Sequence, residues 1–578
     1  MKDHTFSALL SVSWAQQVYF TVQGPSRRED CSSTPELVEP YYYTRSFGFT
    51  QTETIRTATP APNLEPTAPA NFSRGIYSTT VSPTPILSTE LLLPPPLYFG
   101  PKDCYKIPKG FILAVAGAAA QVEGAVAHEG RSPSAPDVLS ELLTAGGIPA
   151  GALIGGAITN GYTAAENYYL YRQDIDRLAA MGIKVYSFSI SWTRILPFAL
   201  PGSPVNSNGL EHYDNLINYA ITKGVQPVVI LLHMDTPLQF FGDNYLEGIR
   251  QRPYYGYFNM GYQNETFEEA FVKYGKIIMS QFADRVPIWV TVNELQTGCV
   301  SGPSIDHIIK AHARLHHFYH DELHGTGKIT MKMAWTPGVP QDPKNEAHLA
   351  AVQHYNDLLA GTFLNPLVLG QDYPDAFKKA IQDYVALSAE DLAYLNGTMG
   401  ILSFDGYSAV SVFPAVPDLD ICATDNATTS RYYPTCVGTT QRRADGWLMG
   451  FHTDYLMYAT PTYVRTQLNY IWATYGTPIA ITEFGLPMNV DGVLDLPSIR
   501  YDVLRSEYYL SYLTEVLKAI WEDGVDVLGV FAWSWVDTWE WGTYAHQFGL
   551  QYNNRTTQER TYKRSFFDFL DFVENRRL

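Results

Sequence analysis

Two glutamates each close a short apolar run of the kind found in buried β-strands. Glu294 ends the run IWVTVNE, and Glu483 ends the run IAITE. One carboxyl group that protonates a leaving oxygen, with a second that meets a positive carbon, is the set needed to cleave a glycosidic bond. Either glutamate alone would equally suit a helix cap or an ion pair, so the hypothesis depends on the two lying together.

The surrounding sequence alternates short β-rich runs with longer helical patterns, which indicates repeated βα units. Helical stretches such as AENYYLYRQDIDRLAAMG and RSEYYLSYLTEVLKAIWEDG each close with a glycine, as helix ends commonly do. Eight strands in this arrangement predict an α/β fold, a (β/α)₈ TIM barrel. The predicted strands are Phe111–Gln121, Val185–Ser191, Pro227–His233, Ile288–Glu294, Lys328–Trp335, Gly400–Tyr407, Pro478–Glu483 and Val527–Trp535.

Polar or aromatic residues stand at or near the carboxyl ends of five of these runs, the end where barrel enzymes carry their sites. The two glutamates belong to the fourth and seventh strands, so they should enter the barrel mouth from opposite sides. One such residue is easily a hydrogen-bonded structural group, whereas five on one face indicate an active site. They are Gln121, His233, the pair Asn293 and Glu294, Glu483 and Trp533.

Composition narrows the class of ligand. Of 578 residues, 46% are hydrophobic and 14% aromatic, enough for a large core and for flat apolar faces that suit sugars. The formal net charge of -18 disfavours nucleic acid and anionic membrane surfaces and favours neutral ligands. There is no uninterrupted apolar stretch of 18 residues, so no transmembrane helix is expected.

The first hundred residues differ in composition from the rest. Residues 1–17 resemble a short signal peptide, and residues 18–101 form a Pro/Thr/Ser-rich, low-complexity extension that we expect to be mostly disordered. The catalytic domain is predicted over 102–578. N-x-[ST] sequons favour a secreted glycoprotein, with a cytoplasmic protein as the alternative. The sequons begin at Asn71, Asn264, Asn396, Asn426 and Asn554.

Five cysteines leave an odd count and show no CxxC spacing, so neither a zinc site nor a redox motif is indicated. Cys422 and Cys436 bracket a polar segment and are candidates for a loop disulfide. Cys31 and Cys104 are candidates for a second one, which would leave Cys299 as a thiol.

Over about residues 108–567 the sequence resembles glycoside hydrolase family 1, the β-glucosidases and their relatives, and in particular a fungal-type secreted member. TVNEL is similar to the family's T-x-N-E-P acid/base motif, and ITEFG to its I/V-T-E-N-G nucleophile motif. FILAVAGAAAQVEGA, VYSFSISWTRILP and VVILLHMDTP resemble its first three strands, and AWSWVDTWEW resembles its sugar-binding segment.

This resemblance implies a role for each site residue. Glu294 would be the acid/base, with a pKa raised by burial and by the charge of Glu483, and Glu483 would be the nucleophile that forms a covalent glycosyl-enzyme. Tyr407 would donate a hydrogen bond to Glu483. The sugar would be bound by Gln121, His233, Asn293, Trp533, Glu540 and Trp541. The family implies a small β-glucoside or oligosaccharide substrate and neither a metal nor an organic cofactor.

The chain departs from the family pattern at several positions. The largest departure is Ser187, where the family carries an arginine that helps to keep the nucleophile ionised. With no cation from that strand, hydrogen bonds should keep Glu483 ionised, and Tyr407 is the expected donor. The other departures are Met234 for Trp, Leu295 for Pro, Phe484 for Asn and Asp405 for Asn.

The expected activity is therefore that of a retaining β-glucosidase acting on terminal β-D-glucosyl residues. β-Galactosidase and β-fucosidase are alternatives, since glucose and galactose differ only at the 4-hydroxyl. A lapsed homologue that binds glycans without cutting them is the alternative from another class. Ser187, Met234 and Asp405 motivate it, whereas the joint presence of Glu294, Glu483 and Tyr407 opposes it.

Overall fold

The computed structural model describes residues 81–94, 103–144, 159–200, 202–242, 260–299, 301–416, 418–424, 432–453, 457–489 and 494–577. The predicted signal peptide and most of the predicted extension lie outside these ranges, as do Asn71, Asn426 and Cys31. None of the described helices is both long and apolar enough to cross a bilayer.

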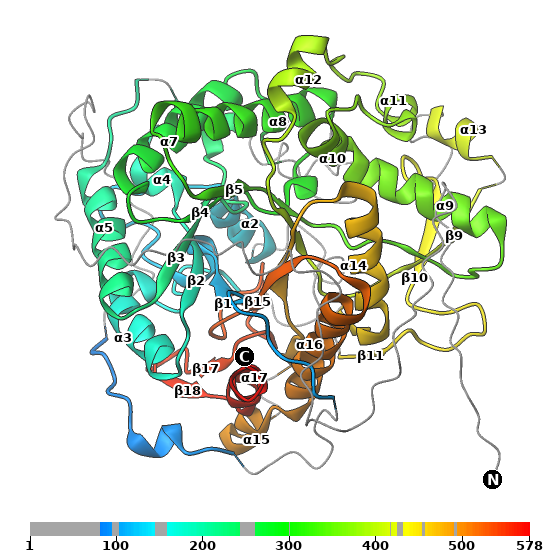
Figure 1. Cartoon of the computed structure of the whole chain (residues 1–578). Coiled ribbons are helices and arrows are strands. Elements are labelled where there is room, and N and C mark those ends of the chain that lie inside the picture. Colours follow the sequence, from blue (N-terminus) through cyan, green and yellow to red (C-terminus); the bar gives the residue numbers. More distant parts are fainter. Residues whose placement is uncertain are drawn as a thin grey trace, which may run out of the picture.

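A parallel barrel forms the centre of the molecule and confirms the predicted TIM fold (Figure 1). Its hydrogen-bonded order is β5-β4-β3-β2-β1-β15-β13-β8-β6. The first and last of these are two pieces of one strand, divided at Met331, so the fifth strand pairs with its neighbours on both sides. The strands are β1 (Ile112–Gly117), β2 (Val185–Ser189), β3 (Gln226–Leu232), β4 (Ile288–Val292), β5 (Lys328–Thr330), β6 (Lys332–Met333), β8 (Leu402–Asp405), β13 (Ile479–Phe484) and β15 (Val527–Trp533).

All eight predicted strands are present, and most are shorter than predicted. The difference matters at the first strand, which ends at Gly117 rather than at Gln121. Gln121 instead lies on the single helical turn α1 (Ala119–Val122), where its side chain is fully buried. The apolar run AVAGAAA is as compatible with a helical turn as with a strand, because its alanines fit both.

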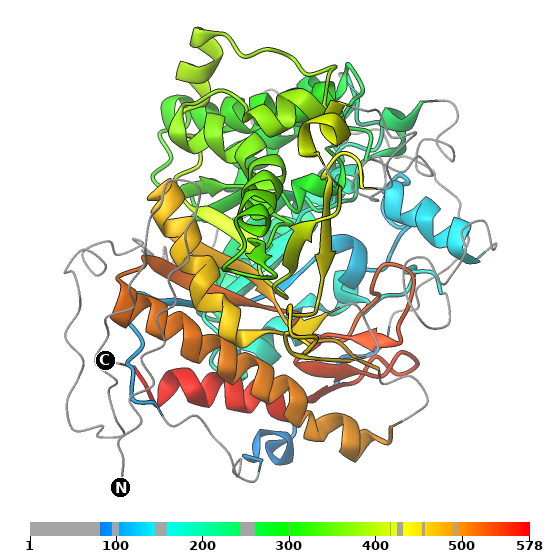
Figure 2. The same ribbon diagram turned by 90° about the vertical axis from the view of Figure 1, so that its right-hand side faces the viewer.

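Helices surround the barrel, as Figures 1 and 2 show from two sides. The predicted helices α3 and α16 are present, and each is followed by a glycine with positive φ: Gly182 (89°) and Gly524 (73°). The longer helices are α2 (Ala135–Thr144), α3 (Asn167–Ala180), α5 (Ser207–Thr222), α7 (Phe267–Phe282), α8 (Gly302–His317), α9 (Glu346–Asn356), α14 (Pro461–Tyr475), α16 (Val503–Asp523) and α17 (Arg564–Glu574). Shorter ones are α4 (Trp192–Ile195), α10 (Thr362–Leu364), α11 (Asp375–Ala380), α12 (Ala389–Leu395), α13 (Leu419–Thr424) and α15 (Leu496–Tyr501).

Small antiparallel and mixed sheets lie in the connections between barrel strands and in the segment that follows β15. β9 (Ser411–Pro414) pairs with β7 (Val339–Pro340) and with β10 (Val437–Thr440). The others are β11 (Phe451–His452) with β12 (Tyr458–Ala459), β14 (Met488–Asn489) with β16 (His546–Gln547), and β17 (Gln551–Asn553) with β18 (Arg560–Tyr562).

The cysteine predictions are answered in part. Cys422 and Cys436 form a disulfide with a Cα–Cα distance of 5.8 Å, as predicted. Cys104 is also disulfide-bonded, and its predicted partner Cys31 lies outside the described residues. Cys299 is a buried thiol.

The core has two layers because successive strand residues point to opposite faces of the sheet. Residues such as Ile112, Val228, Ile230 and Val290 fill the inside of the barrel. Their neighbours along the strands pack outward against the helices in a single large cluster. The ends of the strands are therefore held rigidly, which is what positions the site.

Part of the predicted extension contacts the barrel. A 3₁₀ turn, Ser88–Leu91, brings Glu90 to 2.8 Å from Arg177 of α3 in an ion pair, and the backbone amide of Thr84 donates to Gln173. Arg177 is itself fully buried. Residues 81–94 thus belong to the folded body, although their composition resembles that of the extension.

Candidate active site

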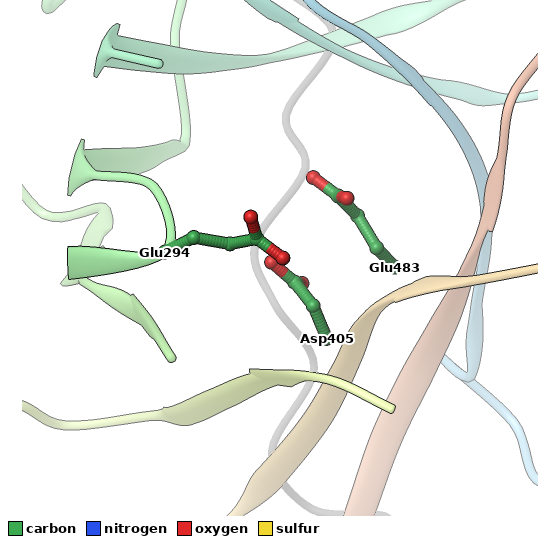
Figure 3. A group of neighbouring side chains, drawn as sticks. All are labelled: Glu294, Asp405 and Glu483. Carbon is green, nitrogen blue, oxygen red and sulfur yellow. The ribbon is translucent and has the colours of Figure 1, made fainter. Parts of the chain in front are cut away.

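Three carboxyl groups from three barrel strands point into the same space (Figure 3). Glu294 follows β4, Asp405 ends β8 and Glu483 lies near the end of β13. One oxygen of each lies within 4.8 Å of an oxygen of the others. The two glutamates therefore do face each other across the mouth, as their places on the fourth and seventh strands predict.

The backbone at Glu294 is in the left-handed region, with φ 46° and ψ 50°. A non-glycine residue rarely adopts this conformation, and its cost of order 1–3 kcal/mol is met by the surrounding structure. The turn lets the chain leave β4 and enter a 3₁₀ turn, Leu295–Thr297, while the side chain points into the barrel mouth. Burial and the charge of Glu483 raise the pKa of Glu294 to about 8. The carboxyl is therefore protonated at neutral pH.

Glu483 has a different environment. Tyr407 donates a hydrogen bond of 2.7 Å to its Oε2, as expected. Its Oε1 receives a hydrogen bond from the ammonium group of Lys332, on β6, which also forms an ion pair with it. The expected hydrogen bond from Tyr407 is therefore present, but the expectation was incomplete, because Lys332, which the sequence analysis passed over, also contacts Glu483 directly.

Lys332 was missed because KITMKMAW has the charge and alternation of a half-exposed strand. The alternation holds, but its polar face is the inside of the barrel rather than the solvent. The signal that could have found Lys332 was Ser187, which stands where the family carries an arginine. A buried carboxylate is normally paired with a cation, so its absence from β2 indicates that another strand supplies one.

Asp405 is the third carboxyl group. Its Oδ1 accepts a hydrogen bond of 2.9 Å from the hydroxyl of Thr482 and lies 3.6 Å from Nζ of Lys332. Burial and the charge of Glu483 raise the pKa of Asp405 well above its ordinary value, against the opposing effect of Lys332. Burial and Glu483 thus make Asp405 easier to protonate than an ordinary aspartate, whereas Lys332 favours its charged form.

The predicted sugar ligands surround this carboxyl group cluster. Gln121, His233 and Asn293 are all at most 2% exposed. Asn293 and His233 lie 3.2 Å apart, Nδ2 to Nε2. Each of these three residues has a buried polar atom without a hydrogen-bond partner in the described ranges: Oε1 of Gln121, Nδ1 of His233 and Oδ1 of Asn293. Buried polar atoms are normally paired, so these atoms mark where a hydroxyl-bearing ligand would bind.

Residues of the segment that follows β15 lie beside Gln121, His233 and Asn293 and complete the predicted sugar-binding region. The ring of His233 is stacked near Trp533 and Trp541, with centroids 5.7 Å and 6.2 Å away. Glu540 is buried, and burial raises its pKa to about 8, although hydrogen bonds with Trp533 and Gln121 lower it. The structure brings all nine predicted site residues into one region at the carboxyl ends of the strands.

The remaining departures from the family pattern have local explanations. Phe484 packs among apolar rings, with its centroid 4.9 Å from that of Tyr509, and Leu295 is fully buried. Met234 is buried with a φ of 60°. Ser187 is fully buried on β2, and its hydroxyl has no hydrogen-bond partner among the described residues.

The cluster of Glu294, Asp405 and Glu483 is the group of described residues whose oxygen ligands are close enough to hold a metal ion. The ammonium of Lys332 already lies among these oxygens. The arrangement therefore sets an acid that keeps its proton, Glu294, opposite a second carboxyl group, Glu483, that accepts from both Lys332 and Tyr407.

Comparison with known proteins identifies the family. Residues 104–578 match the model of glycosyl hydrolase family 1. The chain is 31% identical to β-glucosidase 1B of Phanerodontia chrysosporium, over 79% of this chain and 83% of that one. It is 28% identical to β-glucosidase 40 of Arabidopsis thaliana, over 81% and 92%.

Solved structures give the same result. The rice β-glucosidase Os3BGlu6, a mutant in a covalent complex with glucose, has a TM-score of 0.70 and 26% identity, over 80% of this chain and 98% of that one. β-Glucosidase 2 of Trichoderma reesei, in complex with Tris, also has a TM-score of 0.70 and 26% identity, over 81% and 99%. From the match over nearly all of the barrel domain, the chain belongs to glycosyl hydrolase family 1.

Proposed function

We propose that this protein is a retaining β-glucosidase that removes terminal β-D-glucosyl residues, with Glu294 as acid/base and Glu483 as nucleophile. The observation that carries the assignment of roles is the unlike setting of the two glutamates. Glu483 accepts from both Tyr407 and the ammonium of Lys332, whereas burial and the charge of Glu483 raise the pKa of Glu294 to about 8.

In the first step Glu294 gives its proton to the glycosidic oxygen while Glu483 attacks the anomeric carbon. The bond from that carbon to the leaving oxygen breaks, the aglycone departs as an alcohol, and the sugar becomes a glycosyl ester of Glu483. The narrow approach of the carboxyl oxygens, within 4.8 Å, suits direct attack better than the wider gap that holds a water in inverting enzymes.

In the second step the roles reverse. With Glu483 esterified, its negative charge is gone, so one of the two causes that raise the pKa of Glu294 is removed. Glu294, now ionised, takes a proton from a water molecule as the oxygen of that water attacks the anomeric carbon from the face that the aglycone left. The bond from this carbon to Glu483 breaks, so that Glu483 is released as a carboxylate and Glu294 again carries a proton. Two inversions give retention of configuration.

Sugar binding rests on the buried polar atoms and rings beside the carboxyl groups. Gln121, His233 and Asn293 each offer to a hydroxyl group an atom that no other described residue pairs with. Trp533 presents a flat apolar face that suits the C–H face of a pyranose. Glu540 lies within hydrogen-bonding reach of Gln121, so the two are placed to share the outer hydroxyls.

The relatives support a glycoside as substrate, and they favour glucose in particular. The relatives described above are named β-glucosidases, and the rice structure carries glucose in a covalent complex. A covalent complex is what a retaining mechanism produces.

Azide rescue of two variants tests the roles. Glu294→Ala should recover turnover of an activated aryl glucoside when azide is added, and the product should be the β-glycosyl azide. Glu483→Gly should give the α-glycosyl azide, because azide then attacks where the nucleophile stood. The same anomer from both variants would show that the roles are misassigned.

A panel of nitrophenyl glycosides tests the sugar. We expect the highest kcat/KM on the β-glucoside, with the β-galactoside and β-fucoside following, because the residues given above for binding do not single out the 4-hydroxyl. Nitrophenol release from none of them, with glycan binding retained, would instead support the lapsed homologue.

We propose secretion on separate grounds. The Cys422–Cys436 disulfide suits an oxidising compartment, and the sequon residue Asn396 is exposed. Expression in the native host, followed by mass analysis before and after enzymatic removal of N-glycans, tests this. A mass shift in protein recovered from the medium is the expected result, and unglycosylated protein found only in the cytoplasm would contradict it.

A further inference from the structure

A buried lysine lies at the centre of the catalytic carboxyl groups. The side chain of Lys332 is fully buried, and its ammonium group forms ion pairs with Glu483 and with Asp405. Within the described ranges no other lysine or arginine forms an ion pair with Glu483. The titratable groups facing this pair are Glu294, Asp405, Tyr407, His233 and Glu540.

The strand alternation explains how a lysine comes to be there. Ile329, Met331 and Met333 pack outward against the helices, so Thr330 and Lys332 point into the barrel. Lys332 lines a small interior cavity together with Ser187, Thr330, Ser403 and Thr482. Ser187 on β2 is small and its hydroxyl is unpartnered among the described residues, so the space beside it is open to the lysine stem from the fifth strand.

Electrostatics favours a charged lysine at this place. Burial alone would lower the pKa of Lys332, but the charges of Asp405 and Glu483 outweigh burial and raise it above its ordinary value. Of the facing groups, His233 supplies no charge, because burial and Lys332 hold its pKa well below the ordinary value. Lys332 is thus the cation that balances the carboxylate of Glu483.

We propose that Lys332 is a positioning residue that keeps Glu483 ionised and oriented for attack, in place of a cation from the second strand, where Ser187 stands. This inference rests on the proposed role of Glu483 as nucleophile. Lys332 does not touch the sugar in this account. It acts through Glu483 by offering one charged donor, while Tyr407 offers a neutral donor to the other oxygen.

The test is the rate of covalent trapping by 2-deoxy-2-fluoro-β-D-glucosyl fluoride, measured against pH. Fluoride departs with little help from an acid, so the acidic limb of this rate reports mainly the ionisation of the nucleophile. Lys332→Met removes the charge and keeps the stem. The limb should move to higher pH by about 1–3 units, the usual effect of a neighbouring opposite charge. At a fixed pH below the limb, the trapping rate should fall about tenfold for each pH unit by which the limb has moved.

The companion variant Lys332→Met/Ser187→Arg returns a cation from β2. Its acidic limb should return toward that of the unaltered protein. Should Lys332→Met fail to fold, Lys332→Met/Asp405→Asn removes a carboxyl group together with the cation, and the same upward shift is expected of it.

The matched control is Lys563→Met. Lys563 is also a fully buried lysine in an ion pair, 2.6 Å from Asp537, and it has no contact with Glu483. This variant should lose stability but keep its acidic limb in place. The comparison distinguishes the effect of a charge beside Glu483 from the effect of losing any buried lysine.

Two outcomes overturn the inference. If Lys332→Met leaves the acidic limb where it was, Lys332 does not keep Glu483 ionised. If adding Ser187→Arg does not bring the limb back, a cation on β2 cannot replace Lys332. Mass analysis of the trapped protein gives an independent readout. A label on Glu483 upholds the proposed function whatever the limb does, whereas a label on another carboxyl group refutes that function itself.

Discussion

The hydroxyl of Tyr407 lies 2.7 Å from Oε2 of Glu483, and the backbone around it is fixed by two further tyrosines. Tyr508 and Tyr512, on α16, each donate a hydrogen bond of 2.8 Å to the carbonyl oxygen of Tyr407. A helix outside the barrel thus holds the donor that orients the proposed nucleophile.

Tyr407→Phe should lower kcat/KM for an aryl glucoside and move the acidic limb of its pH profile upward. A charge-assisted hydrogen bond contributes about 1.5–3 kcal/mol, so a loss of roughly ten- to hundredfold is expected. Because Lys332 remains, the limb should move less than in Lys332→Met. A larger shift in Tyr407→Phe would mean that the tyrosine, not the lysine, dominates the charge balance.

Glu294→Gln should change stability in a pH-dependent way. The pKa of Glu294 is about 8 in the folded chain against an ordinary 4.5, so folding favours its protonated form. That advantage is complete below pH 4.5 and is lost as the pH rises through 8. Glutamine does not ionise, so the variant should gain stability relative to the unaltered protein across this window, by about 1–3 kcal/mol near neutral pH. Urea unfolding at pH 4, 6 and 8 checks this, and a difference that stays constant with pH would contradict it.

Asp405→Asn should be tolerated. Burial and the charge of Glu483 already favour the protonated form of Asp405. An asparagine has nearly the same shape as that form and is likewise uncharged. We expect kcat/KM to change by no more than about fivefold, or roughly 1 kcal/mol. Asp405→Ala is the matched comparison, since it removes the acceptor of the Thr482 hydrogen bond and opens a cavity. Equal losses in both variants would show that the carboxyl group itself is required.

Deletion of residues 24–80 should leave kcat/KM unchanged, because every site residue lies after position 120 and the deletion spares Glu90. Glu90→Gln should instead lower the free energy of unfolding by about 2 kcal/mol, since it leaves the buried Arg177 without its carboxylate. Steady-state kinetics of the deletion variant and thermal unfolding of Glu90→Gln make these measurements. Loss of activity on deletion of 24–80 would place part of that stretch in the site.

The sequence was most informative where local patterns and fold agree. Periodicity located all eight barrel strands, and the position of Glu294 and Glu483 at strand ends predicted that they would meet. It was less informative about strand ends, which depend on packing: Gln121 reaches the site from a helical turn because β1 stops at Gly117. Similarly, composition could not reveal that Glu90 reaches α3, since that contact joins segments far apart in the chain.

Lys332 shows the limit most clearly. Its neighbours in sequence describe an ordinary alternating strand, and a lysine at such a position is usually exposed. Only the closure of the barrel turns the polar face of that strand inward. Only the contacts with Glu483 and Asp405 stabilise a charged lysine in that interior. Neither the closure of the barrel nor the positions of these two carboxyl groups can be predicted from the residues next to Lys332 in the sequence.

The exchange between Ser187 and Lys332 also bears on how sequences of this kind are read. A column-by-column comparison counts Ser187 as a damaged position and Lys332 as an unremarkable one, and so misjudges both. Under the exchange that we propose, the two positions act as one unit, so that the effect of a substitution at either depends on which residue stands at the other.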